Sequence, residues 1–216
     1  MRSRIERKIR KRLRSLRHQD PEFVSTFEKH ERSGASISSA LRIVMFDPGA
    51  GWYRRGTAAK VLALADAQGA VAGLLDLFFT QTGEIELWET ALTIEHGADR
   101  TAVPRLVDAL YDENPDRRHA AARALGWIWA VSRQAGKALV RALLDKSQPQ
   151  PVREEAAESL AYSNYPRAIP PLISVLDETD VRMRFWAVFA LGGVGQRQTY
   201  ATVVAAGSGA GAETLA

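Results

Sequence analysis

Residues 117–126 read RRHAAARALG, and this stretch decides the fold because its pattern recurs along the chain. The same shape appears at 54–63, 152–161 and 183–192, and a weaker copy lies at 84–93. The recurring leucines are Leu62, Leu92, Leu125, Leu160 and Leu191, so the steps between them are 30, 33, 35 and 31 residues. A period of this length is typical of arrays built from stacked helix pairs.

Each copy predicts the first helix of a pair, because its small residues and its leucine fall on one helical face. A second apolar segment follows, most clearly VPRLVDAL at 103–110 and IPPLISVL at 169–176. Pro104 and Pro170 stand where a helix begins, a position that needs no backbone donor. An acidic residue then closes each second helix: Asp47, Asp112, Asp145 and Asp177.

The phrases VREEAAESLA and AIPPLISVLD resemble HEAT-like repeat proteins, in particular the phycobilisome-lyase (PBS lyase HEAT-like) type. The resemblance implies an all-α fold: a right-handed α-α superhelix, or α-solenoid, of about five helix pairs with an N-terminal helical cap. We expect a basic amphipathic helix and cap at 1–35, the solenoid at 36–195, and an atypical or disordered tail at 196–216. The repeat type is specific for fold and not for function.

Composition limits the protein class. The 216 residues suffice for one elongated domain, and the absence of cysteine excludes disulfides and thiolate metal sites. Neither a membrane-spanning apolar run nor a signal peptide is expected. We therefore expect a cytoplasmic protein, with peripheral attachment to a membrane left open.

The positive charge is concentrated at the N-terminus. Residues 1–20 hold nine basic and two acidic residues, whereas the rest holds 20 basic and 23 acidic residues. Ile5, Ile9, Leu13 and Leu16 form a narrow apolar stripe that indicates a helix. The stripe is interpreted as the packing face of a cap, but residues 2–17 leave two alternatives open, an anionic membrane surface and nucleic acid. A targeting peptide is a further alternative.

Four repeats place an arginine in one slot, and each is preceded by one of the closing aspartates. We interpret this set as a structural ladder in which each arginine pairs with a nearby aspartate and joins adjacent repeats. Its members are Arg55, Arg118, Arg153 and Arg184 with Asp47, Asp112, Asp145 and Asp177.

No catalytic or cofactor-binding constellation emerges. HEAT-like deoxyhypusine hydroxylases carry His-Glu pairs in the third and fourth places of the repeat phrase, where they hold two irons. In the four clear copies those places read Gly56-Thr57, His119-Ala120, Glu154-Glu155 and Phe185-Trp186. We therefore expect no catalytic residue, no cofactor, no metal site and no small-molecule site, although enzyme activity stays open.

The predicted function is that of a non-enzymatic scaffold or adaptor that binds another protein through the concave face formed by the second helices. The candidate binding residues are Asp76, Arg105, Asp108 and Arg141 on the second helices, with Trp129 and Phe185 as exposed aromatic anchors. One alternative is a phycobilin lyase-like chaperone or lyase subunit. The other is a nucleic-acid-binding HEAT-like protein that uses the basic N-terminal helix.

Overall fold

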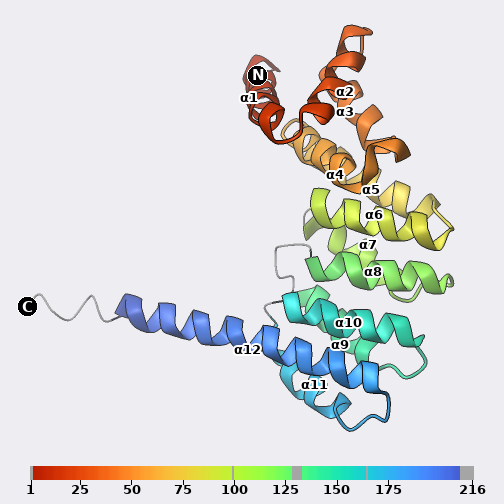
Figure 1. Ribbon diagram of the computed structural model, residues 1–216, viewed down its shortest axis with the longest axis vertical. Helices are drawn as coiled ribbons and strands as arrows, with labels where there is room; N and C mark the ends of the chain where they lie inside the picture. Colours follow the sequence, from red (N-terminus) through yellow and green to blue (C-terminus); the bar gives the residue numbers. More distant parts are fainter. Residues whose placement is uncertain (1, 99, 128–132, 164, 210–216) are drawn as a thin grey trace, which may run out of the picture. The chain divides into compact units, whose positions relative to one another are not determined.

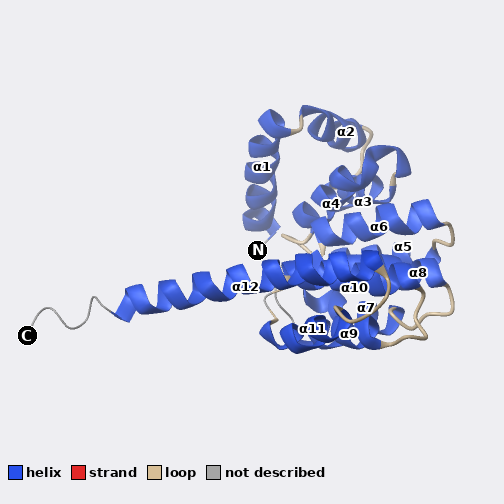
Figure 2. Ribbon diagram, turned by 60° about the horizontal axis from the view of Figure 1, so that its bottom comes forward, coloured by secondary structure: helices blue, strands red, loops and turns tan. Residues whose placement is uncertain are grey.

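The computed structural model describes the backbone of residues 2–98, 100–127, 133–163 and 165–209, and the side chains of 4–98, 101–126, 133–163 and 165–195. Throughout these residues the regular structure is helical, and Figure 2 shows helices joined by short loops. The chain is an all-α solenoid of consecutively packed helices. Over the part that the structure describes, we find no helix with the length and apolarity needed to cross a membrane.

The first three helices form the N-terminal part. They are α1 (Arg2–Gln19), α2 (Pro21–Arg32) and α3 (Ile37–Phe46). Asp20 ends α1 and caps α2 by accepting a hydrogen bond of 3.0 Å from the amide of Phe23. The apolar stripe of α1 is buried, with Ile9, Leu13 and Leu16 exposing 2%, 6% and 2% of their surface. Burial of this stripe holds α1 against α2 and α4 (Gly51–Leu62).

The rest of the described chain alternates between first and second helices of each pair. The first helices are α4, α6 (Glu84–Gly97), α8 (Pro115–Trp127), α10 (Gln150–Tyr162) and α12 (Val181–Gly209). The second helices are α5 (Ala67–Thr80), α7 (Val103–Ala109), α9 (Arg133–Leu144) and α11 (Ile169–Val175). Short 3-10 turns at Pro48–Ala50, Arg100–Ala102 and Pro166–Ala168 precede α4, α7 and α11.

The chain divides into two compact units near residue 125. Unit 1 contains residues 1–124 with 128–130, and unit 2 contains 125–127 with 131–216. Within unit 1, α4 packs beside α6; within unit 2, α10 packs beside α12, as Figure 1 shows. In each unit the first helices therefore stack on one another, as expected for a repeat array.

Glycines allow the first helices to approach closely. A Cβ atom at Gly193 of α12 would lie 2.5 Å from the carbonyl oxygen of Ala161 on α10. A Cβ at Gly56 of α4 would lie 2.8 Å from the imidazole of His96 on α6. Any larger residue at these two positions would push the stacked helices apart.

The repeating leucines are core residues in three of the five copies. Leu62, Leu125 and Leu160 are buried. In the weak copy, however, Leu92 is half-buried, and Ile94 is fully buried two residues later. Ile94 therefore takes the core position of that repeat. In the last copy Leu191 is half-buried, and Ala187, Ala190 and Val194 form the buried face of α12.

The C-terminal segment begins as a continuation of the last repeat. Helix α12 runs without a break from Val181 to Gly209, so residues 196–209 continue the first helix of the last pair. Residues 210–216 lie outside the described part of the chain.

Candidate partner-binding groove

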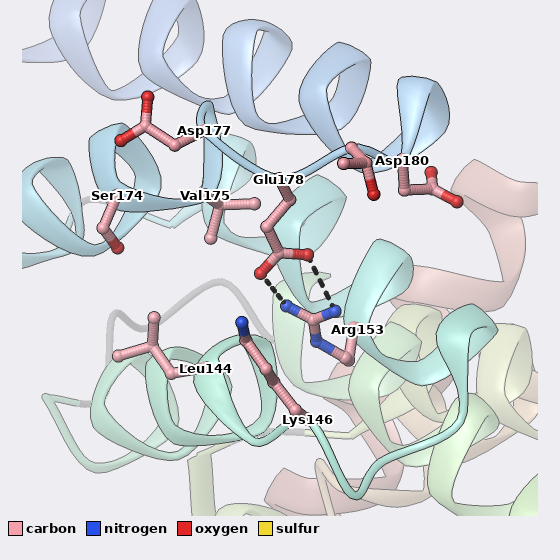
Figure 3. A pocket seen from close by; sticks show the side chains of 9 residues that line it. Leu144, Lys146, Arg153, Ser174, Val175, Asp177, Glu178 and Asp180 are labelled. Carbon is pink, nitrogen blue, oxygen red and sulfur yellow. Dashed lines mark hydrogen bonds and ion pairs between the residues drawn. The ribbon is translucent and has the colours of Figure 1, made fainter.

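A groove of about 560 Å³ lies in unit 2 between the C-terminal ends of α9 and α11. Figure 3 shows Leu144 and Lys146 on one side and Ser174, Val175 and Asp177 on the other. The 177–180 loop, which leads into α12, closes the remaining side. The groove is thus built from two second helices and the turn that follows them.

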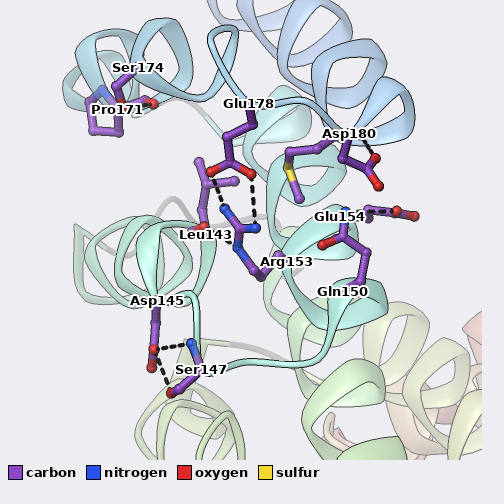
Figure 4. Close-up of polar contacts among 11 residues, drawn as sticks. Leu143, Asp145, Ser147, Gln150, Arg153, Glu154, Pro171, Ser174, Glu178 and Asp180 are labelled. Carbon is purple, nitrogen blue, oxygen red and sulfur yellow. Dashed lines mark hydrogen bonds and ion pairs between the residues drawn. The ribbon is translucent and has the colours of Figure 1, made fainter.

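The ion pair between Arg153 and Glu178 forms the base of this groove, as Figures 3 and 4 show. The Nη1 and Nη2 atoms of Arg153 donate to the two carboxylate oxygens of Glu178 at 3.0 and 2.6 Å. The Nε atom donates to the carbonyl oxygen of Leu143 at 2.9 Å. The Arg153 side chain is 7% exposed, so one buried guanidinium joins α10, the end of α9 and the next loop.

The same pair fixes the charge of Glu178. Hydrogen bonds from Arg153 hold the pKa of this carboxyl below its ordinary value, and they outweigh the opposing effect of burial. A bidentate contact of this kind also fixes the orientation of both side chains. Glu178 therefore stays ionised and holds the loop against α10.

The 177–180 loop is held at further points. Asp180 caps α12 by accepting from the amide of Met183 at 2.9 Å. Arg184 donates to the carbonyl oxygens of Glu178 and Thr179, each at 2.8 Å. These contacts make the loop a rigid wall, which favours binding because little conformational entropy is lost there.

The opposite rim is fixed by a turn after α9. Asp145 accepts hydrogen bonds from the amide and the hydroxyl of Ser147 at 2.9 and 2.6 Å, as Figure 4 shows. Leu144, which lines the groove, exposes 45% of its surface. Exposed Lys146 and Asp177 supply opposite charges on its two sides. The groove can therefore accept an apolar side chain flanked by polar groups.

The predicted second-helix line faces solvent in both units. Asp76, Asp108, Arg141 and Ser174 are all exposed. Arg105 is also exposed, but it donates to Asp76 at 3.3 Å and lies 4.6 Å over the ring of Phe79. In unit 1 the contact with Arg105 offsets the negative charge of Asp76. In unit 2, Arg141 is an exposed cation.

The arginine slot of the predicted ladder makes contacts other than simple pairing with the preceding aspartate. Arg55 donates to the carbonyl oxygen of Met45 at 3.2 Å, just as Arg153 donates to that of Leu143. In both cases the acceptor lies ten residues earlier, near the end of the preceding helix, α3 or α9. Arg184 bonds loop carbonyls, and the Nε of Arg118 is buried without a hydrogen-bond partner.

The aspartates of the ladder instead hold turns. Asp47 accepts from the amide of Gly49, and Asp112 accepts from the amide of Asn114, each at 2.9 Å. Asp145 does the same for Ser147, and Asp177 lies exposed on the groove. Asp112 also pairs with Arg117 at 2.9 Å, one residue before the predicted Arg118. The repeated Asp is thus explained by turn geometry.

The two predicted aromatic anchors are Phe185 and Trp129. Phe185 on α12 is 60% exposed, as the sequence predicted, and Val188 on the same helix is equally exposed. Trp129 lies outside the described residues. Phe185 and Val188 lie three residues apart, so both exposed side chains fall on one side of α12.

Unit 1 contains a second hollow, of about 590 Å³, that the sequence did not reveal. Trp52, Trp88 and Ile85 line it together with Glu84, Glu89 and Asp116. The ring centres of His119 and Trp88 lie 5.1 Å apart. These residues belong to three different first helices, and no repeat slot links them, so the pattern gave no signal.

A polar cluster beside this hollow surrounds His96. Its ring nitrogens lie 3.2 Å from Thr57 Oγ1 and from Lys60 Nζ. Because the Lys60 ammonium can only donate, Nδ1 accepts and Nε2 carries the proton. Burial, with the charge of Lys60 as a smaller cause, lowers the pKa of His96 to about 4.

The buried glutamates of α10 are engaged by protein groups. Glu154 accepts from Arg182 at 2.7 Å and from the amide nitrogen of Gln150 at 3.3 Å. In the part of the chain that the structure describes, we find no group of three or more His, Cys, Asp or Glu side chains arranged to hold a metal ion.

Sequence comparison places these helix pairs in a known family. The sequence profile of HEAT repeats matches residues 86–161 and again 136–209. The chain belongs to the HEAT repeat family. Together the two matches cover more than half of the chain, and they include the weak copy in α6. No curated protein matches the sequence.

One solved structure shows the same fold. Human deoxyhypusine hydroxylase in complex with glycerol matches with a TM-score of 0.50 and 18% identity, over 88% of this chain and 75% of that one. The crystal structure of an engineered protein matches with a TM-score of 0.45 and 22% identity, over 88% and 97% of the two chains. At these identities the likeness concerns the HEAT-like fold alone.

Proposed function

We propose that this chain is a non-enzymatic HEAT-repeat scaffold that binds another protein through its second helices. The observation that carries the proposal is the unit 2 groove, a hollow with an exposed apolar side chain at its edge. Leu144 is positioned by α9, and the base is fixed by the buried Arg153–Glu178 pair. Preformed, partly apolar hollows of this kind are the usual seats of interface anchors.

The chemistry of the groove suggests the kind of partner. Its edge offers apolar contact at Leu144, a cation at Lys146 and a carboxylate at Asp177. We propose that a partner segment inserts one apolar side chain and pairs polar groups with these charges. Arg141, an exposed residue of α9 five positions before Lys146, adds a further cation on that helix.

We do not propose hydroxylase activity for this chain. The repeat places that hold His-Glu pairs in that enzyme family carry other residues here, and the Glu154 carboxylate is bonded to Arg182.

The test uses the intact chain as bait and quantifies bound proteins by mass spectrometry. The variant Leu144→Ser with Lys146→Glu changes two exposed residues that line the groove, so folding should be retained. We expect a partner retained by the unaltered chain to fall at least about tenfold with the variant, because a charge reversal at an interface costs several kcal/mol.

The matched control is Arg167→Glu, which makes the same charge reversal before the other end of α11. It should leave partner recovery unchanged. Equal losses with both variants would indicate a response to net charge. Unchanged recovery with the groove variant would remove the groove as the binding site.

A further inference from the structure

Helix α1 has two sides of different chemistry in addition to its buried stripe. On the side toward α2, Arg10 pairs with Glu31 at 2.7 Å, and Arg17 pairs with Glu28. These contacts neutralise that side. The outward side, which faces away from the other helices of unit 1 in Figure 2, carries a different set of cations.

We call this set the outward basic face; it consists of Arg4, Arg7, Lys8, Lys11 and Arg14. All five side chains are exposed, and their spacings of three and four residues place them on one side of the helix. Among the described residues, no ion pair or hydrogen bond is recorded for the side chains of Arg4, Lys8, Lys11 or Arg14. From Arg4 to Arg14 the face covers ten residue steps, or about 15 Å along the helix axis.

Two further cations strengthen the positive potential at the edge of α1. Arg12 lies close enough to Lys60 of α4 that its charge adds to the effect of burial, and together they lower the pKa of Lys60. Charges of the same sign crowded in this way repel one another, and a bound polyanion relieves that repulsion.

The buried stripe decides between the candidate polyanions. A basic amphipathic helix binds a bilayer by placing its apolar side among the acyl chains. In α1 that side is already used, because Ile9, Leu13 and Leu16 pack against unit 1. The outward basic face has no apolar or aromatic residue, so it offers neither an interface anchor for a protein nor a stacking surface for bases.

We infer that the outward basic face of α1 binds the phosphate backbone of double-stranded nucleic acid without regard to sequence. Arginine and lysine side chains in two staggered rows supply hydrogen bonds and charge to successive phosphates. The apolar stripe beneath them keeps the helix seated on α2 and α4. This surface is independent of the proposed protein-binding groove, which lies in the other unit.

The test measures binding of the full chain to a fluorescent 20-base-pair DNA duplex of mixed sequence, by anisotropy at several salt concentrations. Four phosphate contacts predict a slope of about −3.6 for log affinity against log salt, or roughly a 100-fold loss between 50 and 200 mM. A second duplex of unrelated sequence should bind with the same affinity within about twofold, because backbone contacts carry no sequence information.

A matched pair of variants locates the contact. Lys8→Gln with Lys11→Gln removes two charges from the outward basic face, and the slope should fall to about −1.8. Arg10→Gln with Arg17→Gln removes the same net charge from the α2 side, and the slope should stay near −3.6. Circular dichroism of both variants checks that α1 remains folded.

Three results would overturn the inference. The first is a slope near zero for the unaltered chain. The second is an equal reduction of slope by both double variants, which would indicate net charge alone. The third is binding to vesicles of phosphatidylserine and phosphatidylcholine at 150 mM salt without binding to the duplex, which would assign α1 to a membrane surface.

Discussion

The arginine of the repeat slot makes different contacts in the α4–α6 layer of unit 1 and in the α10–α12 layer of unit 2. In both layers the guanidinium Nε bonds the carbonyl ten residues earlier, at Met45 or at Leu143. Arg153 then gains a bidentate contact with Glu178. Arg55 has no such contact, and Glu89 and Asp47 act on it only through longer-range attraction.

The difference shows which part of the slot belongs to the fold. The carbonyl contact depends on how a second helix ends beside the next first helix, so it repeats. The carboxylate contact depends on one loop residue, so it does not. Burial therefore lowers the pKa of Arg55, which has no carboxylate partner, whereas the hydrogen bonds from Arg153 lower the pKa of Glu178.

The largest effect should come from a feature that the two layers share. Leu62 and Leu160 are both fully buried in their layers. Leu62→Ala and Leu160→Ala should each lower the free energy of unfolding by about 2–5 kcal/mol, because each leaves a cavity among packed helices. Urea unfolding followed by circular dichroism measures both.

Leu191→Ala provides the comparison for these variants, because Leu191 is only half-buried. Its cost should be clearly smaller. A cost below about 1 kcal/mol at both Leu62 and Leu160 would contradict the assignment of these leucines to the packed core of the repeats.

The second effect separates the two layers. Arg153→Met leaves Glu178 without its partner, and removal of one member of a buried pair costs roughly 3–5 kcal/mol. Because the Glu178 side chain is 19% exposed, we expect the lower end of that range. Arg55→Met removes a buried cation with a single recorded hydrogen bond, so its cost should stay below about 1 kcal/mol.

Thermal unfolding of the two arginine variants checks this difference. Similar costs would show that the carbonyl contact, and not the carboxylate, accounts for the contribution of the slot.

The repeating part of this structure was the part that the sequence could predict. Small residues and a leucine at a fixed spacing must face a neighbouring helix, so the helix pairs and the burial of Leu125 and Leu160 follow from the pattern. The weak copy was misplaced at Leu92 because α6 has Thr90 and Thr93 where other repeats have small residues. Ile94 then takes the core position.

The groove could be predicted only in part. Exposure of Arg141 and Ser174 follows from helix periodicity, and the structure agrees. Glu178 carried no signal, since it lies in a loop 25 residues from Arg153 and pairs only when α12 stacks on α10. The pairing of the aspartates with the arginines was predicted from their regular spacing alone. In the structure three of these aspartates accept hydrogen bonds from turn amides.

The third effect is acid sensitivity that begins at a different pH in each layer. The folded-state pKa of His96, about 4, lies below its ordinary value of 6.5, so only the unfolded chain takes up a proton between these values. Stability should therefore fall as the pH drops from 6.5 toward 4. The expected loss is about 1–2 kcal/mol once solvent screening is allowed for.

His96→Gln removes this titration and should flatten the stability profile between pH 6.5 and 4. The control is His18→Gln, which changes an exposed histidine at the end of α1. A profile that is equally steep with and without His96 would contradict the assignment.

The smallest effect concerns Glu178, whose titration begins at lower pH. Its folded-state pKa lies below the ordinary value of 4.5, so its contribution is complete above pH 4.5 and is lost as the pH falls through the folded-state value. Glu178→Gln keeps the shape but replaces charge-assisted hydrogen bonds by neutral ones. At pH 7 the variant should be about 1 kcal/mol less stable. The gap should close as the pH falls below 4.5, because protonation gives the unaltered chain a neutral side chain as well. A gap that stays constant down to pH 3 would mean that Glu178 contributes through packing and not through its charge, and the contrast between the two layers would then lie in shape alone.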